Sequence, residues 1–408
     1  MLLLNLLKKL LLENKMDEPK DIFKKHQAQT FPFPSCIEIE SANGSYITDV
    51  NGKQYLDFVA GVSACTLGHS NPIIIDAVKK QLDKYSHVMV YGEYVQSPQY
   101  KLAKLLADNL PESLSTTYFT NSGAEAIEGA MKLAKRATGR SEIISCKDSY
   151  HGSTQGALSI MGNEEHKAKY RPLLPNCNQI IYNDVESLVN ITKQTAAVVI
   201  EPIQGGTGFV TPKNNFLEKV RERCTQTGTL LIFDEIQTCF GRLGTLLGFE
   251  KYNVIPDILC IAKGMGGGMP IGAFISSWEL MNLLTFEPKL GHITTFGGHP
   301  VNCAASLATL QYLLATDIMQ QVDEKEQLFR THLSHPKIAA IRGTGLMLAI
   351  EFADEELAQK VVEQSLEKGL ILFYFLFTKT AIRITPPLTI SNKEIIDGCN
   401  IILGILDA

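Results

Sequence analysis

Two stretches of the sequence place a reactive side chain directly after an apolar run that resembles a buried strand. Asp234 ends the run that begins at Thr229, and Lys263 ends the run that begins at Ile258. A buried carboxylate needs a cationic partner, because its desolvation otherwise costs several kcal/mol. A buried amine is a candidate nucleophile with a lowered pKa. Each residue alone also has an ordinary explanation: the acid could cap a helix or bind a metal, and the lysine could be a solvated rim charge.

Two further motifs supply an anion site and an aromatic surface. Ser122, Gly123 and Ala124 precede an amphipathic stretch, so their N–H groups could bind an anion at a helix N-terminus, although an ordinary helix cap explains them equally well. Tyr150 could form a stacking face, or it could be a plain core tyrosine. An anion cradle, an aromatic plate, a buried acid and a strand-end lysine are together the parts that hold pyridoxal phosphate. The glycines after Lys263 lead into another strand, which excludes a dinucleotide-binding fingerprint.

The central part of the chain, from about residue 70 to 305, alternates helical patterns with compact apolar runs. This alternation predicts a mainly parallel sheet that is buried between helical layers. Ligands of such sheets bind outside the carboxyl ends of the strands, where Asp234 and Lys263 stand. We expect strands at 142–145, 196–200, 229–233, 258–262 and 272–276, and helices at 126–136 and 216–228.

The two ends of the chain have a different pattern. Short strands are expected at 37–40 and 46–49, and two long helices near 304–332 and 355–368 flank a strand at 345–352. A strand at 381–385 precedes a final helix that begins near residue 392. We therefore divide the chain into an N-terminal segment (1–70), a large α/β domain (71–308) and a C-terminal α+β unit (309–408), with both ends forming the small domain.

Composition excludes several classes of protein. Of the 408 residues, 45% are hydrophobic and 20% are charged, which is below the roughly 25% that is usual and predicts a large core or a subunit interface. A net charge of −5 gives no basic field for nucleic acid, and no apolar stretch is long enough to span a membrane. The nine cysteines form no CxxC pair, which argues against a metal site or a disulfide framework and for the cytoplasm.

The first twelve residues are rich in leucine, and we do not expect them to be a signal peptide. Lys8 and Lys9 interrupt the apolar run, and acidic residues follow where a cleavage site would stand. The leucines fall at helical spacing and predict a short amphipathic helix that packs on its own protein or on a partner subunit. Attachment to a membrane surface and a poorly ordered extension are the alternatives.

From about Phe31 to its C-terminus, the sequence resembles the class III aminotransferases of the acetylornithine, ornithine and 4-aminobutyrate group. The resemblance implies pyridoxal-phosphate fold type I, an α/β fold with a large, mainly parallel sheet of the seven-stranded type and a smaller α+β domain from both chain ends. The motifs that carry it are Asn121-Ser-Gly-Ala-Glu-Ala126, Glu201-Pro-Ile-Gln-Gly205, Asp234-Glu-Ile-Gln237, Lys263-Gly, Thr295-Phe-Gly-Gly and Arg383-Ile-Thr-Pro-Pro387.

The resemblance assigns cofactor roles to residues of these motifs. Lys263 forms the internal aldimine and shuttles the proton between Cα and C4′, while Asp234 pairs with the pyridine nitrogen. The remaining cofactor contacts are those of Gln237 with the ring hydroxyl, Ile236 and Tyr150 with the two ring faces, Gly123 and Ala124 with the phosphate, and Ser122 and Glu201 within the same site.

Other positions are implied to bind substrate or to join two subunits. Thr295 reaches the phosphate of the neighbouring subunit and Thr294 lies beside the substrate, which implies a homodimer with shared active sites. Arg383 clamps a substrate carboxylate, a bidentate task that lysine performs poorly.

The sequence departs from the pattern of this group at two substrate positions. Ser153 stands where many members have an arginine for a second carboxylate, and Gly206 stands where many have a glutamate that covers the clamp arginine. Another cation could substitute for that arginine, and Arg242, Lys147 and Lys379 are the candidates, although solvated surface roles also explain them.

These observations predict a pyridoxal-phosphate-dependent aminotransferase that acts by a ping-pong mechanism. The favoured reaction moves an amino group from an ω-amino donor, of the acetylornithine, ornithine or 4-aminobutyrate type, to 2-oxoglutarate. The alternatives are an aminotransferase that uses an amine or a β-amino acid with pyruvate, an aminomutase, and a binding or scaffold protein that keeps the fold without catalysis.

Overall fold

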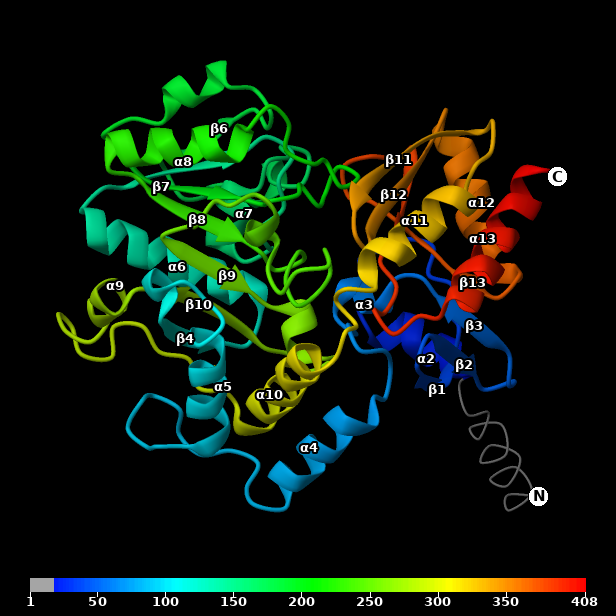
Figure 1. Cartoon of the computed structure of the whole chain (residues 1–408), viewed down its shortest axis with the longest axis horizontal. Helices are drawn as coiled ribbons and strands as arrows, with labels where there is room; N and C mark the ends of the chain where they lie inside the picture. The colour runs from blue at the N-terminus through cyan, green and yellow to red at the C-terminus, as the bar shows by residue number, and fades with distance from the viewer. Residues whose placement is uncertain (1–17) are drawn as a thin grey trace, which may run out of the picture.

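The structure is a computed structural model that describes residues 18–408. The leucine-rich segment for which we predicted an amphipathic helix lies outside the described residues. Two bodies are visible: a large sheet with helices on its faces, and a smaller unit in which the blue N-terminal strands lie beside the orange and red C-terminal elements (Figure 1).

The large body is built on a seven-stranded sheet with the order β4-β10-β9-β8-β7-β5-β6. Only β10 runs antiparallel to its neighbours, so the predicted mainly parallel sheet is confirmed. The strands are β4 (Thr116–Thr120), β5 (Glu142–Cys146), β6 (Cys177–Ile180), β7 (Thr195–Ile200), β8 (Leu230–Asp234), β9 (Ile258–Ile261) and β10 (Gly272–Ser276). Every residue of β7, β9 and β10 is buried, as a sheet covered on both faces requires.

Helix α6 (Gly123–Thr138) covers one face of this sheet and carries the anion cradle at its N-terminus. It buries a side rich in small residues, including Ala126, Ala130 and Ala134. A Cβ atom on Gly129 would lie 2.3 Å from Cε1 of Phe274 in β10, so the glycine allows the helix to approach the sheet closely. Further cover comes from α7 (Gln155–Ile160), α8 (Phe216–Thr227) and α9 (Trp278–Asn282).

The smaller unit contains two four-stranded sheets. The first has the order β1-β2-β3-β13 and the second β11-β12-β15-β14. Leu370 of β13 pairs in parallel with Leu56 of β3, so the two ends of the chain share one sheet. The strands are β1 (Ile39–Asn43), β2 (Tyr46–Asp49), β3 (Gln54–Asp57), β11 (Ile338–Thr344), β12 (Met347–Phe352), β13 (Leu370–Ile371), β14 (Phe373–Tyr374) and β15 (Ala381–Ile384).

The long helix that we predicted near residues 304–332 is two helices in the structure. The structure divides 304–332 into α10 (Pro300–Ala315) and α11 (Val322–His332). Between them Ile318 is buried in the core, and the Cγ atom of Met319 lies 3.1 Å from the place that a Cβ atom on Gly241 would take. The break follows Thr316, whose backbone is extended (φ −126°, ψ 165°), and no glycine or proline marks it in the sequence. The predicted helices near 355–368 and from 392 are confirmed as α12 (Glu355–Glu367) and α13 (Asn392–Leu406).

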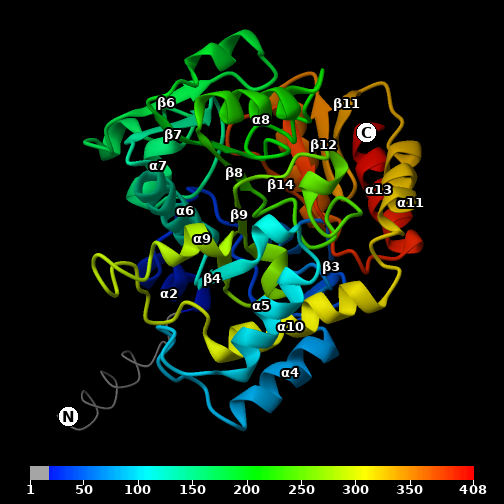
Figure 2. The ribbon, with the colours of Figure 1, turned by 60° about the vertical axis from the view of Figure 1, so that its left-hand side comes forward.

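The remaining helices are α2 (Pro19–His26), α3 (Ala60–Ser63), α4 (Pro72–Leu82) and α5 (Ser97–Ala107). Figure 2 shows α4, α5 and α10 side by side below the large sheet, in agreement with their contacts. Within residues 18–408, no helix combines the length and the apolar character that crossing a bilayer requires.

Candidate active site

The site lies where β8 and β9 end at the same edge of the large sheet. Asp234 is the last residue of β8, and Lys263 opens a short 3₁₀ turn, η5 (Lys263–Gly266), directly after β9. Asp234 is only 5% exposed, and its Oδ1 atom accepts a hydrogen bond from the N–H of Ile236 at 3.0 Å. The neighbouring strands therefore bring the predicted acid and the predicted nucleophile to one edge.

The buried acid has a histidine partner. Nδ1 of His151 lies 2.7 Å from Oδ2 of Asp234, and both side chains are buried. Burial acts to lower the pKa of His151, but the hydrogen bond and the charge of Asp234 outweigh it and raise the pKa. The Nε2 atom of His151 is buried without a partner among the described residues. Sequence reasoning gave His151 no role, although its place beside Tyr150 was a usable signal.

The surroundings of Lys263 favour a neutral, nucleophilic amine. Burial lowers the pKa of Lys263 and the charge of Arg383 acts in the same direction, while Asp234 opposes them. Its backbone is in the left-handed region, with φ of 44°. In the described part of the chain the amine has no hydrogen-bond or ion-pair partner, so a larger fraction is neutral and reactive than for an exposed lysine.

The N-terminus of α6 forms an anion cradle. The Oγ atom of Ser122 accepts a hydrogen bond from the N–H of Glu125 at 3.2 Å, while the N–H groups of Gly123 and Ala124 find no acceptor within residues 18–408. A Cβ atom on Gly123 would lie 2.6 Å from Cδ1 of Ile236, so only glycine fits there without displacing that side chain. Free N–H groups at the positive end of a 16-residue helix suit a phosphate.

Glu201 connects two of the predicted motifs. Its carboxylate accepts hydrogen bonds from the N–H of Gly205 at 3.1 Å and from the N–H of Tyr150 at 3.4 Å. Burial raises the pKa of Glu201 to about 7. Nearby, the Nε2 atom of Gln237 donates to the Oγ atom of Ser63 at 3.3 Å, a contact for which the sequence held no signal.

Arg383 is a buried cation without an acidic partner. It is 6% exposed, and its Nε atom donates to the carbonyl of Tyr374 at 3.1 Å. The guanidinium carbon lies 4.9 Å from the ring centroid of Phe375, and burial lowers the pKa of Arg383 to about 10. No carboxylate of residues 18–408 forms an ion pair with it. A buried guanidinium in this state could pair with a carboxylate from outside the chain.

Thr294 and Ser153 lie at the edge of this cluster, whereas Thr295 is exposed. The hydroxyl of Thr294 accepts a hydrogen bond from Nδ2 of Asn121 at 2.9 Å, which places it beside the α6 cradle. Thr295 is exposed in the protomer. The Oγ atom of Ser153 lies 3.2 Å from the phenol oxygen of Tyr150.

Two of the three candidate cations for a second carboxylate are engaged elsewhere. Arg242 is fully buried and donates to the carbonyls of Leu346 and Pro386. Lys379 is exposed and lies 3.4 Å from Glu355. Lys147 is exposed, and no contact of its amine connects it to the cluster within the described residues.

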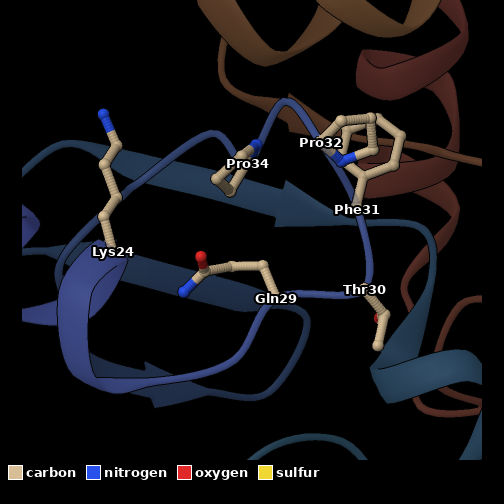
Figure 3. Close-up of a pocket in the computed structure, with 6 residues that line it drawn as sticks. All are labelled: Lys24, Gln29, Thr30, Phe31, Pro32 and Pro34. Atoms are coloured by element: carbon tan, nitrogen blue, oxygen red, sulfur yellow. The ribbon is translucent and has the colours of Figure 1, made fainter.

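A separate hollow of about 560 Å³ lies between α2 and the loop that follows it (Figure 3). In that view Lys24 comes from α2, and Gln29, Phe31 and Pro32 come from the loop that follows the helix. The full lining is Lys24, Gln29, Thr30, Phe31, Pro32 and Pro34. This lining contains no acid and no nucleophile beyond one lysine, so we place the active site at the sheet edge instead.

The residues at the sheet edge fit pyridoxal phosphate. The cradle at Gly123 has free N–H groups for a phosphate, and Asp234 with its histidine partner can hold a protonated pyridine nitrogen. Lys263 provides an unpaired amine for a covalent link. The structure thus brings together Ser122, Gly123, Ala124, Tyr150, Glu201, Asp234, Ile236, Gln237, Lys263 and Arg383, and leaves Thr295 to the outside of the protomer.

Comparison with known proteins supports the same kind of site. The family model described as "Aminotransferase class-III" matches residues 27–406. The acetylornithine aminotransferase of Methanopyrus kandleri is 37% identical over 383 residues, which cover 93% of this chain and 96% of that protein. The ornithine aminotransferase of Toxoplasma gondii is 28% identical, with a TM-score of 0.88 and 97% of each chain covered. An amine transaminase from an uncultivated Pseudomonas species, solved in its PLP-bound form, is 26% identical with a TM-score of 0.84, and the match covers 94% of this chain and 99% of that one.

Proposed function

The chain belongs to the class-III aminotransferase family, and on this premise we propose that it moves an amino group from an ω-amino donor, of the acetylornithine, ornithine or 4-aminobutyrate type, to 2-oxoglutarate. Its cofactor is pyridoxal phosphate, which when bound withdraws electrons from the reacting carbon. The observation that carries the proposal is the half-buried amine of Lys263, which has no hydrogen-bond or ion-pair partner among residues 18–408 and whose pKa is lowered, at the sheet edge where the Asp234–His151 pair lies.

Lys263 would hold the cofactor covalently and, once released, accept and return a proton at Nζ. Its lowered pKa suits both tasks, because a neutral amine is needed to form the covalent link and to accept the proton that it later returns. Asp234 would keep a proton on the pyridine nitrogen, and His151 would hold the acid in place through the 2.7 Å contact. Gly123 and Ala124 would donate to the phosphate.

The other predicted residues complete the site. Tyr150 and Ile236 would cover the two faces of the ring, and Gln237 would reach its hydroxyl. Glu201 would position the Tyr150 loop and the Gly205 turn. Ser122 would cap the helix that carries the cradle, Thr294 would lie beside the substrate, and Arg383 would bind a substrate carboxylate through two hydrogen bonds.

We propose a homodimer in which Thr295 of each chain completes the phosphate site of the other. Thr295 is exposed in the protomer, and Phe296, Ile293 and Leu290 beside it are each about half exposed. Exposed apolar side chains that follow one another closely in the sequence make this segment a candidate surface for contact with another protein. All nine cysteines are unpaired, which supports a reducing compartment such as the cytoplasm.

A second candidate reaction uses an amine or a β-amino acid as donor and pyruvate as acceptor. Two observations favour it: Ser153 offers only a hydroxyl where a second carboxylate would need a cation, and Gly206 carries no acid. A Ser153→Arg variant supplies the missing cation. Its ratio of kcat/KM for 2-oxoglutarate to that for pyruvate should rise about tenfold if the second carboxylate lies within reach of position 153.

The experiment that tests the proposed function has two parts. Borohydride reduction followed by peptide mass spectrometry should find the cofactor attached to the Lys263 peptide, and a Lys263→Ala protein should show no such adduct. Donors of the ω-amino type are then paired with 2-oxoglutarate and with pyruvate. Turnover with pyruvate alone would replace the first reaction by the second, and turnover without any acceptor would indicate an aminomutase.

A further inference from the structure

Two histidines that are far apart in the sequence form a stacked pair beside the Thr295 segment. The imidazole rings of His87 and His299 are nearly parallel, with an angle of 7° between their planes and centroids 5.3 Å apart. The ring of Phe296 packs against both, with its centroid 4.9 Å from that of His87 and 6.1 Å from that of His299. The N–H of His299 also donates to the carbonyl of Phe296 at 2.9 Å. The pair therefore holds the residue that directly follows Thr295.

Several features of the pair favour neutral imidazoles. The Nδ1 atoms of both rings are buried, and neither has a hydrogen-bond partner among residues 18–408. A neutral ring can leave that nitrogen unprotonated, whereas an imidazolium carries a proton on both nitrogens and would bury a donor without an acceptor. His299 is also the N-cap of α10, and the N-terminal end of a helix carries a partial positive charge. Burial and the charge of His87 together lower the pKa of His299.

The surroundings of the pair offer no counter-charge within residues 18–408, where no ion pair joins either imidazole to an acid. Helix α10 carries no charged side chain, and Cys303 is neutral because burial raises the pKa of its thiol. On the Thr295 segment, the Nδ1 atom of His292 lies 3.0 Å from Nζ of Lys132 and is engaged there. Helices α4 and α5 pack against α10, and their charged side chains and those of the loop between them are exposed: Asp76, Lys79, Lys80, Asp83, Lys84, Glu93, Lys101 and Lys104. Two protonated rings would thus place like charges 5.3 Å apart without an acid to pair with them.

We propose that His87 and His299 are positioning residues: as a neutral stacked pair they hold Phe296, and with it Thr295, where Thr295 completes the phosphate site of the neighbouring subunit. Acid protonates both rings, and the repulsion between the two charges then separates them and withdraws Thr295. The proposal rests on the shared active site proposed above. It adds that two residues outside the buried active-site cluster make binding of pyridoxal phosphate sensitive to acid.

The test measures the dissociation constant of pyridoxal phosphate from the holoenzyme at about pH 7.5 and about pH 5.5, on either side of the range in which histidine titrates. The double variant His87→Phe/His299→Phe keeps two aromatic rings that cannot be charged. On acidification, wild type should lose about tenfold more affinity than this variant, because a hydrogen bond from Thr295 to the charged phosphate is lost. His335→Gln is the matched control, since His335 contacts Asp407 in the smaller unit, and it should lose as much affinity as wild type.

Thr295→Ala removes the hydroxyl through which the pair acts. In that background, the histidine pair and the phenylalanine pair should lose the same affinity in acid, within about threefold. Sedimentation velocity of each protein shows whether the neighbouring subunit is present. Thermal melting checks the folding of each variant, and His87→Phe alone replaces a double variant that does not fold, because one imidazole has no like charge to repel.

Three results would overturn the proposal. The first is an equal loss of affinity in acid by wild type and by the phenylalanine variant. The second is a difference between them that persists in the Thr295→Ala background, and the third is a wild type that binds the cofactor as a monomer. Failure of the proposed function is seen separately, as cofactor binding without amino transfer, and the affinities then still judge the histidine pair.

Discussion

The stacking of Arg383 on Phe375 allows us to predict how much the ring contributes to the affinity of the site for a carboxylate. The guanidinium carbon lies 4.9 Å from the ring centroid, and Arg383 is only 6% exposed. A cation–π contact contributes about 0.5–1 kcal/mol at an exposed site and about 2 kcal/mol when desolvated, so the burial of this pair places it near the upper value. Phe375→Leu keeps the apolar volume but removes the face of the ring. We expect affinity for a carboxylate to fall about 10- to 30-fold, since 1.4 kcal/mol corresponds to tenfold.

The assay is titration of the holoenzyme with pentanoate, together with kcat/KM for 5-aminopentanoate. Phe209→Leu is the matched control, because Phe209 packs edge-on against Phe375 with centroids 4.7 Å apart and leaves the ring beneath Arg383 in place. That variant should bind pentanoate within about threefold of wild type. Arg383→Lys should lose more than Phe375→Leu, because an ammonium group cannot make the bidentate contact.

Two results would refute this reasoning. Pentanoate binding by Phe375→Leu within twofold of wild type would show that the ring does not support the cation. An equal loss in Phe209→Leu and Phe375→Leu would show that general packing of the aromatic cluster, rather than the face of one ring, determines the affinity. Thermal melting of both variants separates either result from a loss of folded protein.

Three further predictions concern stability, pH and the buried acid. Gly129→Ala should destabilise the fold by about 1–3 kcal/mol in urea denaturation, because the new methyl group meets the ring of Phe274 at 2.3 Å, and Phe274→Leu should recover part of the loss. The raised pKa of Glu201, about 7 against an ordinary 4.5, means that the folded state binds this proton more tightly than the unfolded state, so wild-type stability should fall as the pH rises from about 4.5 to about 7. Glu201→Gln should remove that fall, which amounts to about 3 kcal/mol at most, and a wild-type curve parallel to that of the variant would contradict the assignment. Asp234→Asn should lower kcat roughly 100-fold or more and lower the pKa of His151, which NMR titration of the imidazole would detect, while an unchanged His151 titration would contradict the role of the pair.

Much of the fold was predictable because its signals are local. Strands buried on both faces appear as continuous apolar runs, and β7, β8 and β9 lie within a residue of their predicted bounds. The separation of α10 from α11 was not predictable in this way. It depends on Ile318 and Met319 entering the core, and the residues around them have no breaking signal of their own.

The site residues also separate into those that the sequence identified and those that only the structure revealed. Asp234 and Lys263 were identified because each directly follows a buried strand, and parallel strands deliver their carboxyl ends to one edge. His151, the partner of Asp234, stood in a motif that we had noted, but the sequence assigned it no role. Its contact with Asp234 joins segments that are far apart in the sequence. The contact of Gln237 with Ser63 is of the same kind.

The sequence by itself therefore determined which chemical groups are present, which of them end buried strands, and which cofactor they suit. Only the tertiary structure decided what faces those groups: the ring of Phe375 beneath Arg383, and the ring of Phe377 over Gly206. The reason is physical. Chain order and hydrophobic period specify local conformation, whereas the space and charge around a side chain depend on how distant segments pack. The absence of an acid at position 206 could be seen in the sequence, but the ring of Phe377 that lies beside this position could not.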